Sequence, residues 1–177
     1  VLAGGAACRS AGTAAGAAGT EILWDRYGVP HVHAASLPAL GRAFGWAQAR
    51  NHGDLLLRLY GQARGRAAEY WGGAENLAED RWVRTVAGPR AGDRAYAAMA
   101  PEYRAYVDAF AEGINDYARR HPERIVDSVE VVLPVTGADV HAHMARVMTS
   151  FFLSSRQGVA AAAQRWSADG APARGAG

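Results

Sequence analysis

The chain has 177 residues, of which half are hydrophobic and 20% are charged. This length suits a single domain with its own core, and the apolar content excludes a wholly disordered chain, which would bury too little surface to offset its ordering entropy. The 19 basic residues, all arginine, and the 17 acidic ones give a net charge of +2 without a long basic face, so we expect no nucleic-acid partner. There is no apolar run of about 20 residues, so we also expect no membrane span.

Both ends of the chain are rich in alanine and glycine. Residues 1–20 have no carboxylate and no helical periodicity, and we expect a disordered leader or the remnant of an export signal. Cys8 is then an incidental thiol or a lipid-modified residue, although Gly5 stands where a lipidation signal normally has a branched apolar side chain. Residues 167–177 are expected to be a linker or a processed tail. The folded body is therefore expected to span residues 21–166.

Two short strands and then a long helix are predicted at the start of the body. The segment Glu21–Ala34 has alternating and β-branched apolar residues on both sides of Tyr27-Gly28, which favours two strands with a bend between them. Pro30 lacks a backbone N–H donor, so the second strand is expected at an edge. Ser36 is a predicted N-cap, and the apolar spacing that follows predicts a helix to Tyr60.

Three glycines lie within this predicted helix, at Gly41, Gly45 and Gly53. Each costs about 1 kcal/mol relative to alanine in a helix interior. Such costs indicate either that the helix packs closely against another backbone or that it breaks near Gly53.

The rest of the body is predicted to be mostly helical, so the fold class is α+β with little strand. Further helices are expected as a second piece from Arg58 to Gly72, over Ala78–Val86, over a strongly periodic segment from Pro101 to His121, and from an N-cap at Asp139 to Gln157. The short apolar run Val129–Leu133 is either a strand or an extended link.

Two histidine pairs are candidate metal ligands. His31 and His33 are two apart on a predicted strand and share a face, whereas His141 and His143 lie at a predicted helix start, where residues two apart diverge. Neither pair has a cysteine or carboxylate at a spacing that completes a site. We therefore favour structural histidines over a small metal-binding protein, and we assign this chain no metal and no cofactor.

The carboxylates offer no acid–base pair, because they are scattered over different predicted elements: Asp25, Asp54, Glu69, Asp80 and Asp108. Asp25 and Asp54 stand near arginines and are expected to form ion pairs. The sequence also lacks a G-x-S-x-G elbow, a phosphate-binding glycine loop and a nucleotide fingerprint. We therefore expect no catalytic residue in this chain.

An apolar cluster ends the last predicted helix, with Met148, Phe151, Phe152 and Leu153 followed by Arg156. On composition alone it is a helix face buried in a core. The alternative is that it forms the wall of an apolar acyl-chain pocket, with Arg156 as a polar group at the pocket edge or as a solvated charge.

An ordered set of motifs runs through residues 21–156. It comprises D-R-Y-G-V-P-H (Asp25–His31), a glycine- and alanine-rich helix (Gly41–Ala49), G-R-A-A-E-Y-W-G (Gly65–Gly72), and the helix ending in E-G-I-N-D-Y-A-R-R. This set resembles the amino-terminal part of the penicillin amidase family. These are N-terminal-nucleophile hydrolases that include penicillin, cephalosporin and acyl-homoserine lactone acylases.

The resemblance implies that this chain is the small (alpha) chain cut from a precursor. It would pack with a large (beta) chain from that precursor to complete an αββα sandwich. The large chain would begin with the nucleophile, a serine whose own α-amino group serves as the base. The substrates would be small N-acyl molecules such as acyl-homoserine lactones, β-lactams or both, and the protein would be secreted or periplasmic. Members that bind calcium use a glutamate from the last helix, and no carboxylate lies between Asp139 and Asp169 here.

The resemblance also favours a binding role for the apolar cluster. We expect Met148, Phe151, Phe152 and Leu153 to line the acyl pocket, with Arg156 at its edge. The alternative is a non-enzymatic helical interaction domain, which predicts a stable monomer that expresses alone.

Overall fold

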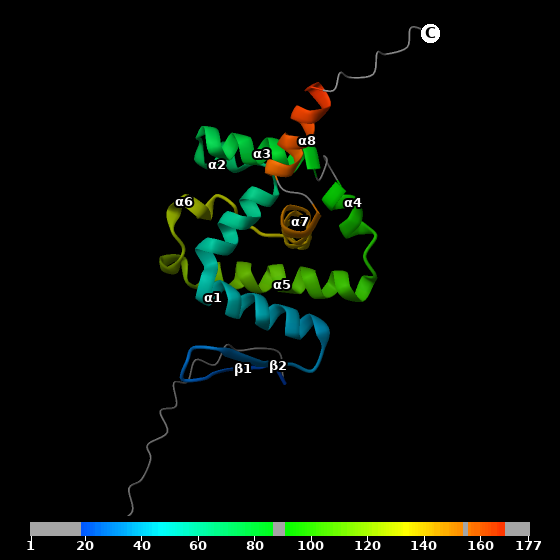
Figure 1. The fold of residues 1–177 in the computed structure, drawn as a ribbon. Helices are drawn as coiled ribbons and strands as arrows, with labels where there is room; N and C mark the ends of the chain where they lie inside the picture. Colours follow the sequence, from blue (N-terminus) through cyan, green and yellow to red (C-terminus); the bar gives the residue numbers. More distant parts are fainter. Residues whose placement is uncertain (1–18, 87–90, 154–155, 169–177) are drawn as a thin grey trace, which may run out of the picture.

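The computed structural model describes residues 19–86, 91–153 and 156–168, which form a mostly helical body with one small sheet (Figure 1). The elements in chain order are β1 (Glu21–Trp24), β2 (Pro30–His33), α1 (Leu37–Ala63), α2 (Ala67–Trp71), α3 (Ala74–Val86), α4 (Ala91–Ala97), α5 (Pro101–Arg120), the 3-10 turn η1 (Pro122–Arg124), α6 (Asp127–Glu130), α7 (Gly137–Met148), the π-helical turn η2 (Thr149–Leu153) and α8 (Arg156–Ala168). Within these residues, no helix is both long and apolar enough to cross a bilayer.

Several predicted boundaries shift in the structure. The helix predicted up to Gly72 divides into α1 and α2, and Gly65 takes a positive φ of 64° between them. α3 begins at Ala74, four residues before the predicted start, and α4 was not predicted. α8 extends to Ala168, inside the expected tail, while Cys8 and residues 169–177 lie outside the described residues.

The two strands pair as an antiparallel hairpin in which Ile22 lies opposite Val32. The Asp25 carboxylate closes the connection by accepting hydrogen bonds from the backbone N–H groups of Tyr27 (2.8 Å) and Val29 (3.0 Å). These bonds, the one from Val29 foremost, lower the pKa of Asp25 despite an opposing contribution from burial.

Neither predicted ion pair with arginine forms among the described residues: Asp25 instead lies 3.5 Å from the Nε2 atom of His31, and both aspartates accept backbone N–H groups. Asp25 caps its turn, and Asp54 accepts the N–H of Val126 at 2.9 Å. Aspartate side chains compete well for nearby backbone donors, which explains why proximity to arginine in the sequence was misleading.

Both expectations for the glycines of α1 are confirmed, at different positions. α1 and α5 lie side by side, and a Cβ atom at Gly45 would overlap the backbone carbonyl of Phe110 (Figure 1). Gly113 on α5 faces the backbone of α1 in the same way, at Arg42. The helix then kinks at His52, whose φ of −143° is not helical. The glycines therefore let two helix backbones approach closely.

The core fills the space between α1 and α5 and is closed by the segment after α5. Leu57, Ile114 and Val132 are its largest fully buried side chains. The prediction of a strand or extended link over Val129–Leu133 is wrong, because the helical turn α6 reaches Glu130 and further turns follow it. This irregular path buries both Val129 and Val132.

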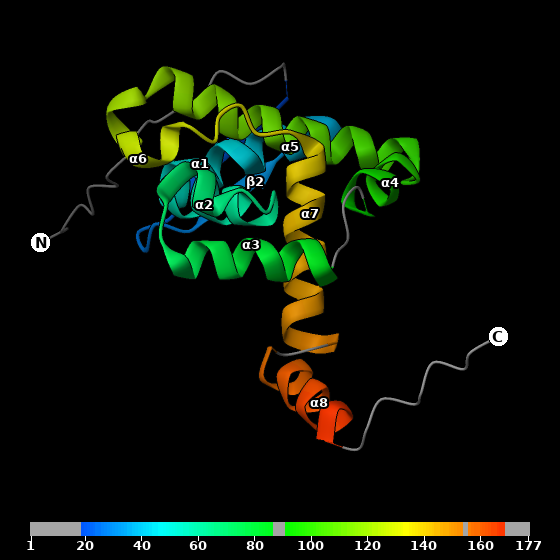
Figure 2. The same ribbon diagram turned by 90° about the horizontal axis from the view of Figure 1, so that it is seen from above.

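α7 and η2, residues 137–153, run past α3 and away from the core (Figure 2). We call these residues the arm. The N-cap of α7 is Thr136 and not the predicted Asp139, which instead lies in the first turn and closes a capping box with Thr136. The helix predicted through Gln157 is also divided, because η2 follows Met148 and α8 begins at Arg156.

Candidate functional site

The arm carries four of the five predicted substrate-binding residues, since Arg156 begins α8, and one side of the arm is strongly apolar and exposed. Met144 is 58% exposed, Met148 46% and Phe151 81%. Met144 and Met148 lie one helical turn apart and so share a side of α7. We call these three residues the arm face. The side chains of Phe152, Leu153 and Arg156 lie outside the described part of the structure, so their expected roles stay predictions.

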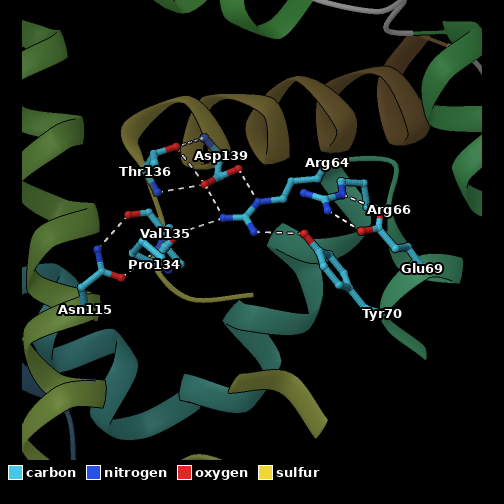
Figure 3. A network of polar contacts seen from close by, with 9 residues as sticks. All are labelled: Arg64, Arg66, Glu69, Tyr70, Asn115, Pro134, Val135, Thr136 and Asp139. Carbon is cyan, nitrogen blue, oxygen red and sulfur yellow. Dashed lines mark hydrogen bonds and ion pairs between the residues drawn. The ribbon is translucent and has the colours of Figure 1, made fainter. Parts of the chain in front are cut away.

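A bidentate ion pair anchors the base of the arm (Figure 3). Arg64, just after α1, donates from Nε and Nη2 to the two carboxylate oxygens of Asp139 at 2.7 and 2.8 Å. The same guanidinium donates to the Pro134 carbonyl at 2.9 Å and to the Tyr70 hydroxyl at 3.2 Å. Asp139 also accepts from the N–H and the hydroxyl of Thr136, both at 2.8 Å. One buried pair therefore connects the end of α1, α2 and the start of α7.

The electrostatics of this anchor favour the charged forms of both partners. Burial alone would raise the pKa of Asp139, but the hydrogen bonds from Arg64 and Thr136 and the attraction to Arg64 outweigh it and lower that pKa. Hydrogen bonding to Asp139 raises the pKa of Arg64. Burial, together with the Asp139 charge, raises the pKa of the Tyr60 hydroxyl, which stays neutral.

Asn115 on α5 holds the segment that leads into the arm (Figure 3). Its side-chain amide donates to the Val135 carbonyl and accepts from the Val135 N–H, both at 2.8 Å. This pair of bonds satisfies the backbone of an irregular segment as a strand partner would, and so sets where α7 begins.

A second ion pair lies further along the arm. Arg146 donates from Nε (2.9 Å) and Nη2 (2.7 Å) to one carboxylate oxygen of Glu79 on α3, and from Nη2 to the Gln62 side-chain oxygen at 3.1 Å. Beyond it, the indole N–H of Trp82 lies 3.5 Å from the Ser150 hydroxyl. Burial lowers the pKa of Arg146, but the guanidinium stays charged, so its carboxylate partner offsets the cost of burying that charge.

The two histidine pairs lie in different surroundings. His31 and His33 are both exposed on one side of β2, whereas His143 packs edge-on against Tyr60 with a buried Nδ1 that has no hydrogen-bond partner. Burial, and then the charge of Arg146, lower the pKa of His143. Across the described residues, no three His, Cys, Asp or Glu side chains gather as metal ligands would.

The remaining carboxylates singled out in the sequence hold local structure. Asp80 is buried and accepts the N–H groups of Ala67 (2.7 Å) and Ala68 (2.8 Å) at the start of α2. Glu69 pairs with Arg66 on the surface, and Asp108 accepts the Tyr96 hydroxyl. Burial and this bond raise the pKa of Tyr96 to about 12.

A groove of about 490 Å³ lies between β1, α1 and α5. Ile22, Pro38 and Trp46 contribute to its apolar wall, and the ion pair of Arg42 with Asp116 lies at its rim. Since none of its lining residues belongs to the arm, it is not part of the candidate site.

The sequence analysis singled out Met148 and Phe151 but not Met144, and it missed both anchors of the arm. The T-x-x-D pattern of Thr136 and Asp139 was a usable signal for the start of α7. The partners Arg64 and Arg146 carried no comparable signal, because each pairs with a residue 67 to 75 positions away.

Comparisons with known proteins agree on one family. The penicillin amidase family model matches residues 19–173. The acyl-homoserine lactone acylase QuiP of Pseudomonas fluorescens is 28% identical over 105 residues, or 59% of this chain and 13% of that protein. A thermostable penicillin G acylase from Alcaligenes faecalis has a similar structure, with a TM-score of 0.69 and 28% identity over 88% of this chain and 86% of that chain. Since the family model spans every described element, from before β1 to beyond α8, the chain belongs to the penicillin amidase family.

Proposed function

We propose that this chain is the alpha subunit of an autoprocessed amidohydrolase, an acylase that cleaves the amide bond of N-acyl substrates such as acyl-homoserine lactones, β-lactams or both. Family membership and similarity to two acylases support this proposal. The observation that carries it is the arm, which is held at its base and again further along by two largely buried ion pairs while its apolar face is exposed. Exposed apolar surface of this kind marks a place for a ligand or a partner chain.

The chemistry would come from the partner. The hydroxyl of its N-terminal serine attacks the amide carbonyl while the serine α-amino group takes the proton, directly or through one water. The amine leaves with a proton, and water then hydrolyses the acyl ester to release the carboxylic acid and the free serine. The α-amino group exists only after the precursor is cut, so processing would switch the enzyme on in the periplasm or outside the cell.

This chain would supply the acyl-binding wall. Burying one methylene group stabilises a complex by about 0.8 kcal/mol, so the length of an apolar pocket selects the acyl chain. Met148 and Phe151 are exposed on the arm face and available for such contact. Phe152, Leu153 and Arg156 follow directly in the chain and complete the proposed wall.

Expression of the intact gene tests the proposal. We expect this chain to co-purify with a larger chain whose first residue is serine, and the complex to release the free amine from N-acyl-homoserine lactones or from penicillin G. Alone, the chain should be insoluble or molten, because the arm face would stay uncovered. A stable, monomeric chain without a partner or amidase activity would instead support the interaction-domain alternative.

Shortening the wall should change acyl preference. Phe152→Ala and Met148→Ala should each raise kcat/KM for longer or bulkier acyl groups relative to short ones, because a removed side chain leaves room for added methylenes. The measurement is kcat/KM over a series of acyl lengths. Val126→Ala, at an exposed valine away from the arm, is the control. If the relative kcat/KM values of the variants matched those of the parent across the series, Phe152 and Met148 would not line the acyl pocket.

A further inference from the structure

We propose that Arg146 and Glu79 form a positioning clamp that sets the tilt of the arm, and so decides which acyl chains the arm face accepts. This inference rests on the proposed function. Neither residue belongs to the arm face, so both would act through the orientation of α7 and without touching the substrate.

The first step is the leverage of the arm. An α-helix rises about 1.5 Å per residue, so Phe151 stands roughly 18 Å beyond the anchor at Asp139. A tilt of only about 5° at that base would displace the tip by about 1.5 Å, and misplacing a reacting group by about 1 Å can cost around 100-fold in rate. The position of the arm face therefore depends on contacts further along α7, where it packs against α1, α4 and α5, as well as on the anchor at its base.

The second step is the placement of Arg146. It is two residues from both Met144 and Met148, which places it on the opposite side of α7 at about 100° per residue. There its side chain is 18% exposed and meets Glu79, whose side chain is 16% exposed. The arm is thus held on this side by α3, while the apolar side chains on its opposite side are exposed.

The third step is the choice of residue. The planar guanidinium donates to Glu79 on α3 and to Gln62 near the end of α1, so it joins three helices at one point. Closer to the tip, the indole N–H of Trp82 on α3 lies 3.5 Å from the Ser150 hydroxyl, a second contact between α3 and the arm. A lysine would keep the charge but lose the rigid fork that makes these bonds together.

The test uses the processed two-chain enzyme made from the intact gene. Hydrolysis of p-nitrophenyl butanoate, octanoate and dodecanoate reports acyl preference independently of the natural leaving group. We expect Arg146→Met to change the dodecanoate-to-butanoate ratio of kcat/KM by about tenfold or more, in line with a displacement near 1 Å. Arg146→Lys should give a smaller change in the same direction. Arg42→Met breaks an ion pair away from the arm and is the matched control.

The outcomes separate the clamp from the proposed function. If the parent neither exposes an N-terminal serine nor hydrolyses any acyl substrate, the proposed function fails. The clamp proposal is wrong if the parent is active but Arg146→Met keeps the dodecanoate-to-butanoate ratio of kcat/KM within about twofold of the parental ratio. It is also wrong if Arg146→Met lowers kcat/KM for all three esters by the same factor. Should Arg146→Met not assemble, Arg146→Lys and Gln62→Leu decide by the same ratio, since each removes only part of the contact.

Discussion

Replacing Gly45 by alanine should destabilise the protein more than any other single methyl group added to α1. The new Cβ would overlap the backbone carbonyl of Phe110 on α5, and a carbonyl inside a helix cannot rotate away as a side chain can. The two helices would have to separate, which opens the core that both of them line. We expect a loss of about 3 kcal/mol or more in the free energy of unfolding, measured by thermal denaturation followed by circular dichroism.

Gly53→Ala is the matched control for this experiment. There the added methyl would meet only the Cδ1 atom at the tip of Ile125, which can move, and alanine is favoured over glycine in a helix by about 1 kcal/mol. Its unfolding midpoint should stay near that of the parent. If Gly45→Ala behaved in the same way, the close approach of α1 and α5 would be wrong.

Arg64→Met should produce the second large effect by leaving the Asp139 carboxylate buried without its partner. Breaking a buried ion pair on one side typically costs about 3–5 kcal/mol. The side chains of Arg64 and Asp139 are 18% and 10% exposed, so solvent screens this pair little. Arg66→Met, at the exposed pair with Glu69 seen in the same network (Figure 3), is the control and should leave the unfolding midpoint almost unchanged.

The dependence on pH gives a sharper check of this ion pair. In the parent, the pKa of Asp139 is lowered in the folded state, so its contribution to stability is present above the ordinary aspartate pKa and is lost as the pH falls through the lowered value. Without Arg64, burial should raise the pKa of Asp139 instead. Protonation of this carboxylate in acid would then remove the buried charge that destabilises the variant. The stability gap between parent and Arg64→Met should therefore be largest near neutral pH and shrink in acid. A gap independent of pH would show that the lost stability is not electrostatic.

Much of the helical framework followed from local signals. The Ser36 side chain accepts the N–H of Ala39 at 3.3 Å as an N-cap, and α5 runs from Pro101 to Arg120, one residue short of its predicted end at His121. Such features depend on residues within one or two turns, so the sequence contains all the information they need. From Val129 to Leu133 the chain forms turns without a regular hydrophobic period, so local signals did not predict its structure there.

The glycines of α1 show the boundary between local and tertiary information. Their cost in a helix was evident from the sequence, and it predicted close packing or a break. Only the structure assigns close packing to Gly45, which faces Phe110, and the break to the neighbourhood of Gly53, at His52. The close packing depends on α5, which begins more than 50 residues after Gly45.

The sequence by itself determined the family, the mostly helical character of the body and the apolar cluster that ends at Leu153, because motifs and periodicity are properties of neighbouring residues. The tertiary structure alone decided that this cluster stands on an arm held by Arg64 and Arg146. Each of these arginines meets its carboxylate from a different helix, and a charge finds such a partner only where folding brings the two together and excludes the water that would otherwise solvate them.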